Sequence, residues 1–149
     1  MNWNNLKSVR LSKICVYLFS AALLVMICTA PWIFRFIIRL RQMEDSALIY
    51  FLISFYTAAI PVSGILWDLH LLLRRIGRSE IFCAGNTSLL RRISWYCFAV
   101  GVICFASMFY YPPFLFIAGS AAFMGLIVRV VKNVFEEADR IKTENDYTI

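Results

Sequence analysis

Three long stretches without a charged side chain constrain this chain more than any other feature of its sequence. Residues 14–34 and 46–67 are uncharged over 21 and 22 positions, and residues 93–128 are uncharged over 36. About 20 apolar residues are enough for a helix to cross a bilayer. The chain is 61% hydrophobic and 16% charged, whereas a soluble domain has about 25% charged residues. The sequence therefore predicts an integral membrane protein.

The longest run must contain a turn, because a helix of that length would be much longer than a bilayer is thick. Pro112 and Pro113 mark its place, since proline has no N–H to donate and disfavours a helical backbone at the residue before it. We therefore predict an all-α integral membrane four-helix bundle in a single domain, 1–149. Its expected parts are helices at about 14–34, 46–67, 93–111 and 114–131, a loop over 68–92 and an amphipathic tail over 129–149.

Lysine and arginine residues are distributed unevenly around these helices. Three precede the first helix, five lie between the second and third helices, and four lie in the tail over 129–149. Twelve are therefore on one side of the membrane. The other side has only Arg35, Arg39 and Arg41. Basic residues are retained in the cytoplasm, so the N-terminus and the C-terminus are both predicted to be cytoplasmic.

The second helix has small and polar residues along one face. They follow one another at steps of three or four, as neighbours on a helix do. The face consists of Tyr50, Ser54, Thr57, Pro61, Gly64 and Asp68. Two interpretations are open: a polar groove for a ligand, or a packing seam against other helices, which we favour because such seams use small and hydroxyl residues. Narrow ridges in the third and fourth helices, around Gly101 and Gly125, favour a compact bundle and leave association of copies open.

The sequence offers no constellation for catalysis. It has one histidine, His70, and neither an HExxH nor a GxSxG motif nor a phosphate-binding glycine loop. We therefore expect no enzyme, no catalytic residue, no metal site and no cofactor. The net charge is +6, and the basic residues cluster beside the apolar runs. This favours membrane lipids over nucleic acid as the partner.

Arg35 and Arg39 lie one helical turn apart at the end of the first predicted helix. Their planar guanidinium groups suit the phosphate of a lipid headgroup or another anionic envelope compound. The alternative is that both side chains simply extend to water. We favour that alternative, because helix ends commonly use arginine in this way.

The predicted loop and tail have complementary charges. Residues 68–92 have a net charge of +3, whereas residues 133–149 have a net charge of −3. Gly77 is expected to end the second helix as a left-handed cap, and Asn86 to begin the third as an N-cap. The tail is expected to dock on this loop or to bind a cytoplasmic partner. The candidate contact residues are Phe82 in the loop and Phe135, Glu136, Glu137, Glu144 and Asp146 in the tail.

The same two regions resemble a family of small bacterial membrane proteins, the domain of unknown function DUF2975. The matching residues are Ile81, Phe82, Asn86, Leu90, Arg91, Ile93 and Ser94, then 129–138, and then Glu144, Asn145, Asp146, Thr148 and Ile149. The likeness covers about the C-terminal half, and Tyr147 stands where we expect leucine. The resemblance implies four helices, a bacterial plasma membrane and no established activity. Members of the family are often encoded beside a small helix-turn-helix regulator, which suggests such a regulator as a partner.

These observations favour a membrane sensor or regulatory adaptor that acts on a cytoplasmic protein. Two alternatives remain open. One is a small transporter, a channel subunit or an envelope-stress immunity protein that uses the polar face of the second helix. The other is a structural subunit of a membrane complex. The absence of charge within the long runs argues against an ion pump, which normally has an ionisable group at membrane depth.

Overall fold

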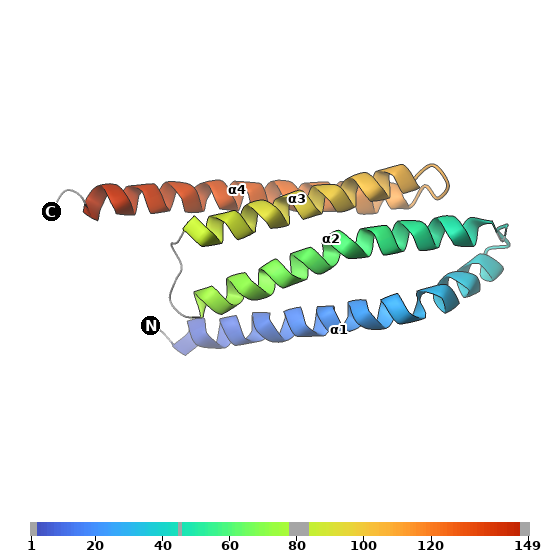
Figure 1. Cartoon of the computed structure of the whole chain (residues 1–149), viewed down its shortest axis with the longest axis horizontal. Helices are drawn as coiled ribbons and strands as arrows, with labels where there is room; N and C mark the ends of the chain where they lie inside the picture. Colours follow the sequence, from blue (N-terminus) through green and yellow to red (C-terminus); the bar gives the residue numbers. More distant parts are fainter. Residues whose placement is uncertain (1–2, 45, 78–83, 147–149) are drawn as a thin grey trace.

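The computed structural model describes residues 3–44, 46–77 and 84–146, and these form four long helices (Figure 1). They are α1 (Trp3–Leu40), α2 (Ala47–Ile76), α3 (Ala84–Ser107) and α4 (Phe114–Asp146). Each contains a segment that is long and apolar enough to cross a membrane. Many large apolar side chains are exposed, among them Trp32 at 83% and Phe116 at 80%. Such a surface indicates a multi-pass membrane protein, because soluble proteins rarely expose so much apolar surface to water.

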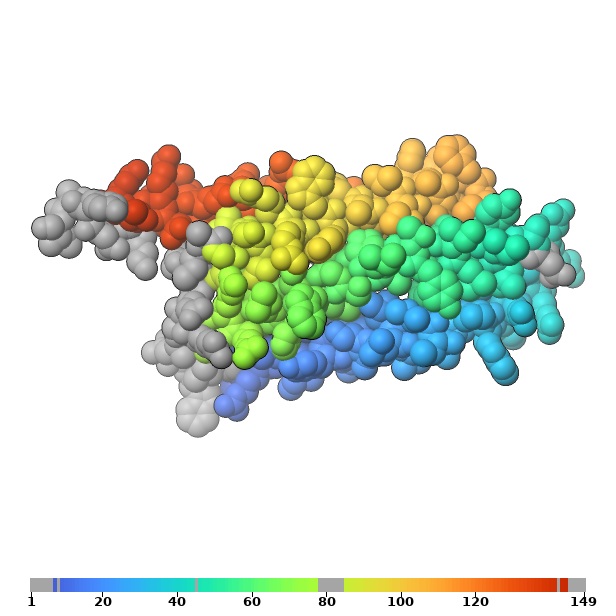
Figure 2. All heavy atoms as spheres, viewed as in Figure 1, coloured from blue at the N-terminus to red at the C-terminus, as the bar shows by residue number. Residues whose placement is uncertain are grey.

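The helices form an open row rather than the compact bundle that we predicted. Within the described residues, the helix backbones approach closely only between neighbours in sequence: α1 and α2, α2 and α3, and α3 and α4. Figures 1 and 2 show α1 and α4 at opposite edges of this row. Small residues on a helix predict that another helix packs closely there, but they do not identify that helix. The outer faces of the row are therefore left to lipid or to other proteins.

The helices continue beyond the uncharged runs at several ends. Of the predicted loop over 68–92, only residues 77–83 lie between α2 and α3. Charged residues end the membrane-compatible segment but do not end a helix, since arginine and glutamate are good helix formers. Gly77 is the C-cap of α2 as predicted, but its φ of −65° is not left-handed. The predicted N-cap at Asn86 was wrong, because Asn86 lies inside α3, which begins at Ala84.

The predicted hairpin between the third and fourth helices is present. α3 ends at Ser107, four residues earlier than expected, whereas α4 begins at Phe114 as predicted. The Tyr111 N–H donates to Ser107 O at 3.2 Å, and the Phe114 N–H donates to Tyr111 O at 3.0 Å. The ring of Phe51 packs against this turn, with centroids 5.2–5.9 Å from those of Tyr110, Tyr111 and Phe114. The turn is thus fixed to α2 by aromatic contacts.

Small residues bring α3 and α4 into close contact. A Cβ atom added to Gly125 would lie 3.2 Å from Cys97 Cβ and 3.3 Å from Ser94 O. The Ser94 hydroxyl donates to Gly125 O at 2.9 Å. Seven residues earlier in α4, Ala118 O lies 3.4 Å from the position of a Cβ on Gly101. Backbone approach of this kind is the usual way in which helices associate without a hydrophobic driving force.

A tyrosine of α2 compensates for a proline inside α1. Pro31 has no N–H, so the carbonyl of Ile27, four residues before it, loses its usual helical donor. The Tyr56 hydroxyl donates to Ile27 O at 3.1 Å. Within lipid this hydrogen bond replaces a missing backbone bond and also ties α1 to the rest of the row.

Changing Tyr56 to phenylalanine is expected to destabilise the protein by about 1 kcal/mol, the usual contribution of one hydrogen bond between membrane helices. The measurement is unfolding by dodecyl sulfate in mixed micelles, followed by circular dichroism. In a Pro31→Ala background the introduced alanine has a backbone N–H that can donate to the Ile27 carbonyl, and the same change should then cost less. Equal costs in both backgrounds would show that the hydroxyl does not replace the missing donor.

Candidate functional site at the charged end of the helix row

The predicted polar face of α2 lies largely along α3. The hydroxyls of Ser107 and Tyr110 lie 2.7 and 2.8 Å from Ser54 Oγ. The Tyr96 ring lies against Gly64, where an added Cβ would be 2.9 Å from Cε2. Pro61 and Asp68 are buried, whereas Thr57 is exposed and Tyr50, stacked on Tyr110, is 57% exposed. Most of the face thus lies against other residues of the chain.

Asp68 is a buried acid at the end of this contact. Its exposure is 0%, and Oδ1 lies 2.9 Å from an Nη atom of Arg92. These are the charged residues that bound two adjacent uncharged runs, 46–67 and 93–128, so the antiparallel packing of α2 and α3 brings them to the same level. Sequence reasoning named Asp68 but missed Arg92 as its partner. The signal that could have identified Arg92 is its place directly before the run 93–128, which matches the place of Asp68 directly after the run 46–67.

The three helices α2, α3 and α4 converge beside this ion pair. Leu72, Leu89 and Leu90 form a buried cluster, and Phe135 of α4 packs against it. Phe135 was predicted to contact the loop or a partner. The three leucines belong to the predicted loop segment 68–92, so Phe135 packs on the chain's own segment, which was one of the two alternatives, and it fixes the base of the tail to the ends of α2 and α3.

Beyond Phe135, α4 projects past the other helices. Ser94 is opposite Gly125, and Gly101 is opposite Ala118, which places Ala84 level with about residue 135. The remaining residues, 136–146, therefore extend about 16 Å further as a helix. Figure 1 shows this red end of α4 lying beyond the ends of α1, α2 and α3.

Three acidic residues of the tail, Glu136, Glu137 and Glu144, have basic partners within the chain. Glu136 accepts from Arg91 of α3 at 3.3 Å and also pairs with Lys132. Arg140 lies 2.7 Å from Glu137 and 3.8 Å from Glu144. The tail thus contacts the basic segment 68–92 at the base of the projection, through the ion pair of Glu136 and the packing of Phe135. The predicted contact residue Phe82 and the side chain of Asp146 lie outside the part of the chain that is described.

Arg35 and Arg39 lie at the opposite end of the row. Both are exposed on α1, and together with Trp32 and Phe36 they line a shallow groove of about 310 Å³. The groove is formed by a single helix. Its shape is compatible with either interpretation of the two arginines and favours neither.

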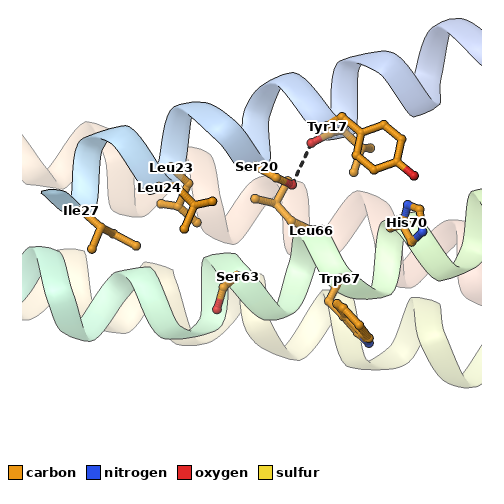
Figure 3. A pocket seen from close by; sticks show the side chains of 10 residues that line it. Tyr17, Ser20, Leu23, Leu24, Ile27, Ser63, Leu66, Trp67 and His70 are labelled. Carbon is orange, nitrogen blue, oxygen red and sulfur yellow. Dashed lines mark hydrogen bonds between the residues drawn. The ribbon is translucent and has the colours of Figure 1, made fainter.

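A second groove, of about 560 Å³, lies between α1 and α2 (Figure 3). Apolar side chains, among them Leu23, Leu24 and Leu66, form most of its wall, and Tyr17 and His70 lie at one end with ring centroids 5.3 Å apart. The sole histidine therefore packs against a tyrosine. No group of three potential metal-binding side chains occurs within the described ranges.

Comparison with known proteins places the whole chain in one family. A family profile described as a protein of unknown function, DUF2975, matches residues 3–149. No curated protein and no solved structure matches the chain significantly. The match includes α1 and α2, so the resemblance is wider than the C-terminal half from which it was first inferred. The four-helix architecture agrees with the expectation for this family, and the chain therefore belongs to the DUF2975 family.

Proposed function

We propose that this protein is a regulatory adaptor in a bacterial plasma membrane, and that the projecting end of α4 binds a cytoplasmic protein. The observation that carries the proposal is the continuation of α4 as one helix to Asp146, well past the ends of α2 and α3. A helix of 33 residues is about 50 Å long, whereas the hydrocarbon core of a bilayer is about 30 Å thick. Part of α4 must therefore lie outside the lipid.

The C-terminal part of α4 has a surface suited to a protein partner. Val130, Val134 and Ile141 lie within a narrow arc of the helix and are 62%, 63% and 50% exposed. Ile141 lies in the projecting segment 136–146, and the two valines precede it on the same face. Acidic side chains flank this stripe, and they match an anionic membrane surface poorly. An apolar stripe with charged borders is the usual form of a helix that binds in a groove of another protein.

The base of the segment supports a regulatory role. Phe135 packs on the leucine cluster, and Glu136 pairs with Arg91, so α4 is attached to α2 and α3 where the projection begins. Any change in the packing of the row would therefore change the position of the tail. The partner that the family resemblance suggests is a small helix-turn-helix regulator. A free-energy difference of only a few kcal/mol between two arrangements of the helices would be enough for a switch.

The test uses two substitutions that each place aspartate on the projecting helix. Ile141→Asp interrupts the apolar stripe, and Thr143→Asp adds the same charge on the opposite, exposed face. Both variants should insert and fold normally. Loss of a buried apolar anchor commonly costs about 2 kcal/mol or more in binding, so Ile141→Asp should lower recovery of the cytoplasmic partner at least about tenfold.

The readout is co-purification from native membranes, with the partner identified by mass spectrometry. Thr143→Asp should retain the partner, and removal of residues 142–149 should abolish its recovery without affecting insertion. If Ile141→Asp and the truncated chain recover as much partner as the wild type, the tail is not the output element.

The open row also supports a second candidate function, a structural subunit of a larger membrane complex. The outer faces of α1 and α4 are free of other helices in the described structure, and neighbouring membrane proteins or further copies could pack there. Recovery of integral membrane subunits in the same purification, without a cytoplasmic protein, would favour this function over the adaptor.

A further inference from the structure

A basic pocket lies between α3 and α4, away from both arginines singled out in the sequence. Its volume is about 300 Å³. Its lining consists of Arg91, Ser94, Trp95, Arg129 and Lys132. Sequence reasoning missed it because its members come from two helices that are adjacent only after the hairpin closes.

The charges in this pocket are only partly neutralised. Lys132 is the most enclosed of the three basic side chains, at 14% exposure, and pairs with Glu136. Arg91 also contacts Glu136, at 3.3 Å. One carboxylate therefore serves two cations, and with Arg129 the group keeps a formal charge of +2. A polar pocket with such an excess attracts an anion.

Its position identifies the kind of anion. Arg129 directly follows the uncharged run 93–128, so the pocket lies where apolar helix surface gives way to charge. Trp95 is 61% exposed, and the guanidinium carbon of Arg129 lies 6.0 Å from the centroid of its ring. Tryptophan and arginine beside an apolar surface are typical of the headgroup level of a membrane. This holds for either orientation of the row.

We propose that this pocket binds the phosphate of an anionic phospholipid, with Arg91, Arg129 and Lys132 contacting the phosphate oxygens and Trp95 packing beside the glycerol and first chain carbons. Guanidinium groups form paired hydrogen bonds with phosphate, and ammonium groups bind it as point charges. The proposal concerns a lipid site and does not depend on the regulatory function of the tail.

The test measures lipid retention by the full chain in a neutral detergent, using native mass spectrometry with phosphatidylglycerol as the probe. The wild type should retain the lipid, and excess inorganic phosphate should not displace it. A double variant, Arg129→Gln with Lys132→Gln, removes two charge-assisted contacts and should lower retention at least about tenfold. The matched control is Arg74→Gln, which removes an exposed arginine at the same end of the row but outside the pocket.

A second variant, Arg91→Gln, covers the case in which the double variant does not fold. The Arg91 side chain is 63% exposed, so its loss should leave the helix packing intact while weakening retention. Unchanged retention in these variants would overturn the proposal. Equal loss in Arg74→Gln would show attraction to charge in general rather than a site. Displacement of the lipid by inorganic phosphate would show that the pocket binds free anions and not a phospholipid.

Discussion

Replacing Arg92 by glutamine is expected to destabilise the protein by about 2 to 3 kcal/mol. Asp68 is fully buried, and Arg92 lies 2.9 Å from it, so the substitution leaves an uncompensated carboxylate in the interior. Breaking a fully buried ion pair costs about 3–5 kcal/mol. The expected loss for Arg92→Gln is smaller because the Arg92 side chain is 53% exposed. Unfolding by dodecyl sulfate in mixed micelles measures the change.

The neighbouring arginine provides the control. Arg91 also forms an ion pair, but both partners are substantially exposed, at 63% and 43%. Arg91→Gln should therefore cost no more than about 1 kcal/mol. Adding Asp68→Asn to Arg92→Gln removes the unpaired charge and should restore much of the lost stability. If Arg92→Gln costs no more than Arg91→Gln, the buried pair does not stabilise the α2–α3 junction.

Replacing Gly125 by leucine is expected to separate α3 from α4 and to destabilise the protein by about 3 kcal/mol or more. Even a single Cβ would contact Cys97 and the Ser94 backbone closely, and a larger side chain has no room in this contact. The hydrogen bond from the Ser94 hydroxyl to Gly125 O would also be lost. The same unfolding titration measures the effect.

A second glycine of the same helix is the matched control. A Cβ added to Gly119 meets nothing within 4 Å. Gly119→Leu should therefore leave stability unchanged or raise it by about 1 kcal/mol or less, because leucine forms helices better than glycine. Equal losses at the two positions would mean that close approach at Gly125 does not hold the hairpin together.

Hydropathy and the position of proline predicted much of the fold. The two prolines at 112 and 113 predicted the hairpin and the start of α4, since backbone chemistry at proline acts locally. Helix ends marked only by charge were predicted less well. Helix α2 continues to Ile76 because the charged residues that limit a membrane span are compatible with a helix in water.

The arrangement of the helices and the partners of the charged residues were not predictable in the same way. Periodicity showed that Gly64, Asp68 and Gly125 lie on contact faces, but Tyr96, Arg92 and Cys97 meet them from another helix. Phe135 illustrates the same point, because the sequence left open whether it contacts the segment 68–92 or a partner. The leucine cluster that covers it comes from α2 and α3.

The proposed adaptor function requires that four helices cross the membrane and leave the projecting end of α4 in the cytoplasm. Labelling of single cysteines by an impermeant reagent on intact cells tests this requirement most directly, in a background in which the five native cysteines are replaced. Cysteine at position 46 or 113, in the two loops at the far end of the row, should react from outside. Cysteine at position 143 should react only after the cells are permeabilised, whereas its labelling on intact cells, with positions 46 and 113 protected, would contradict the orientation and the proposed adaptor function.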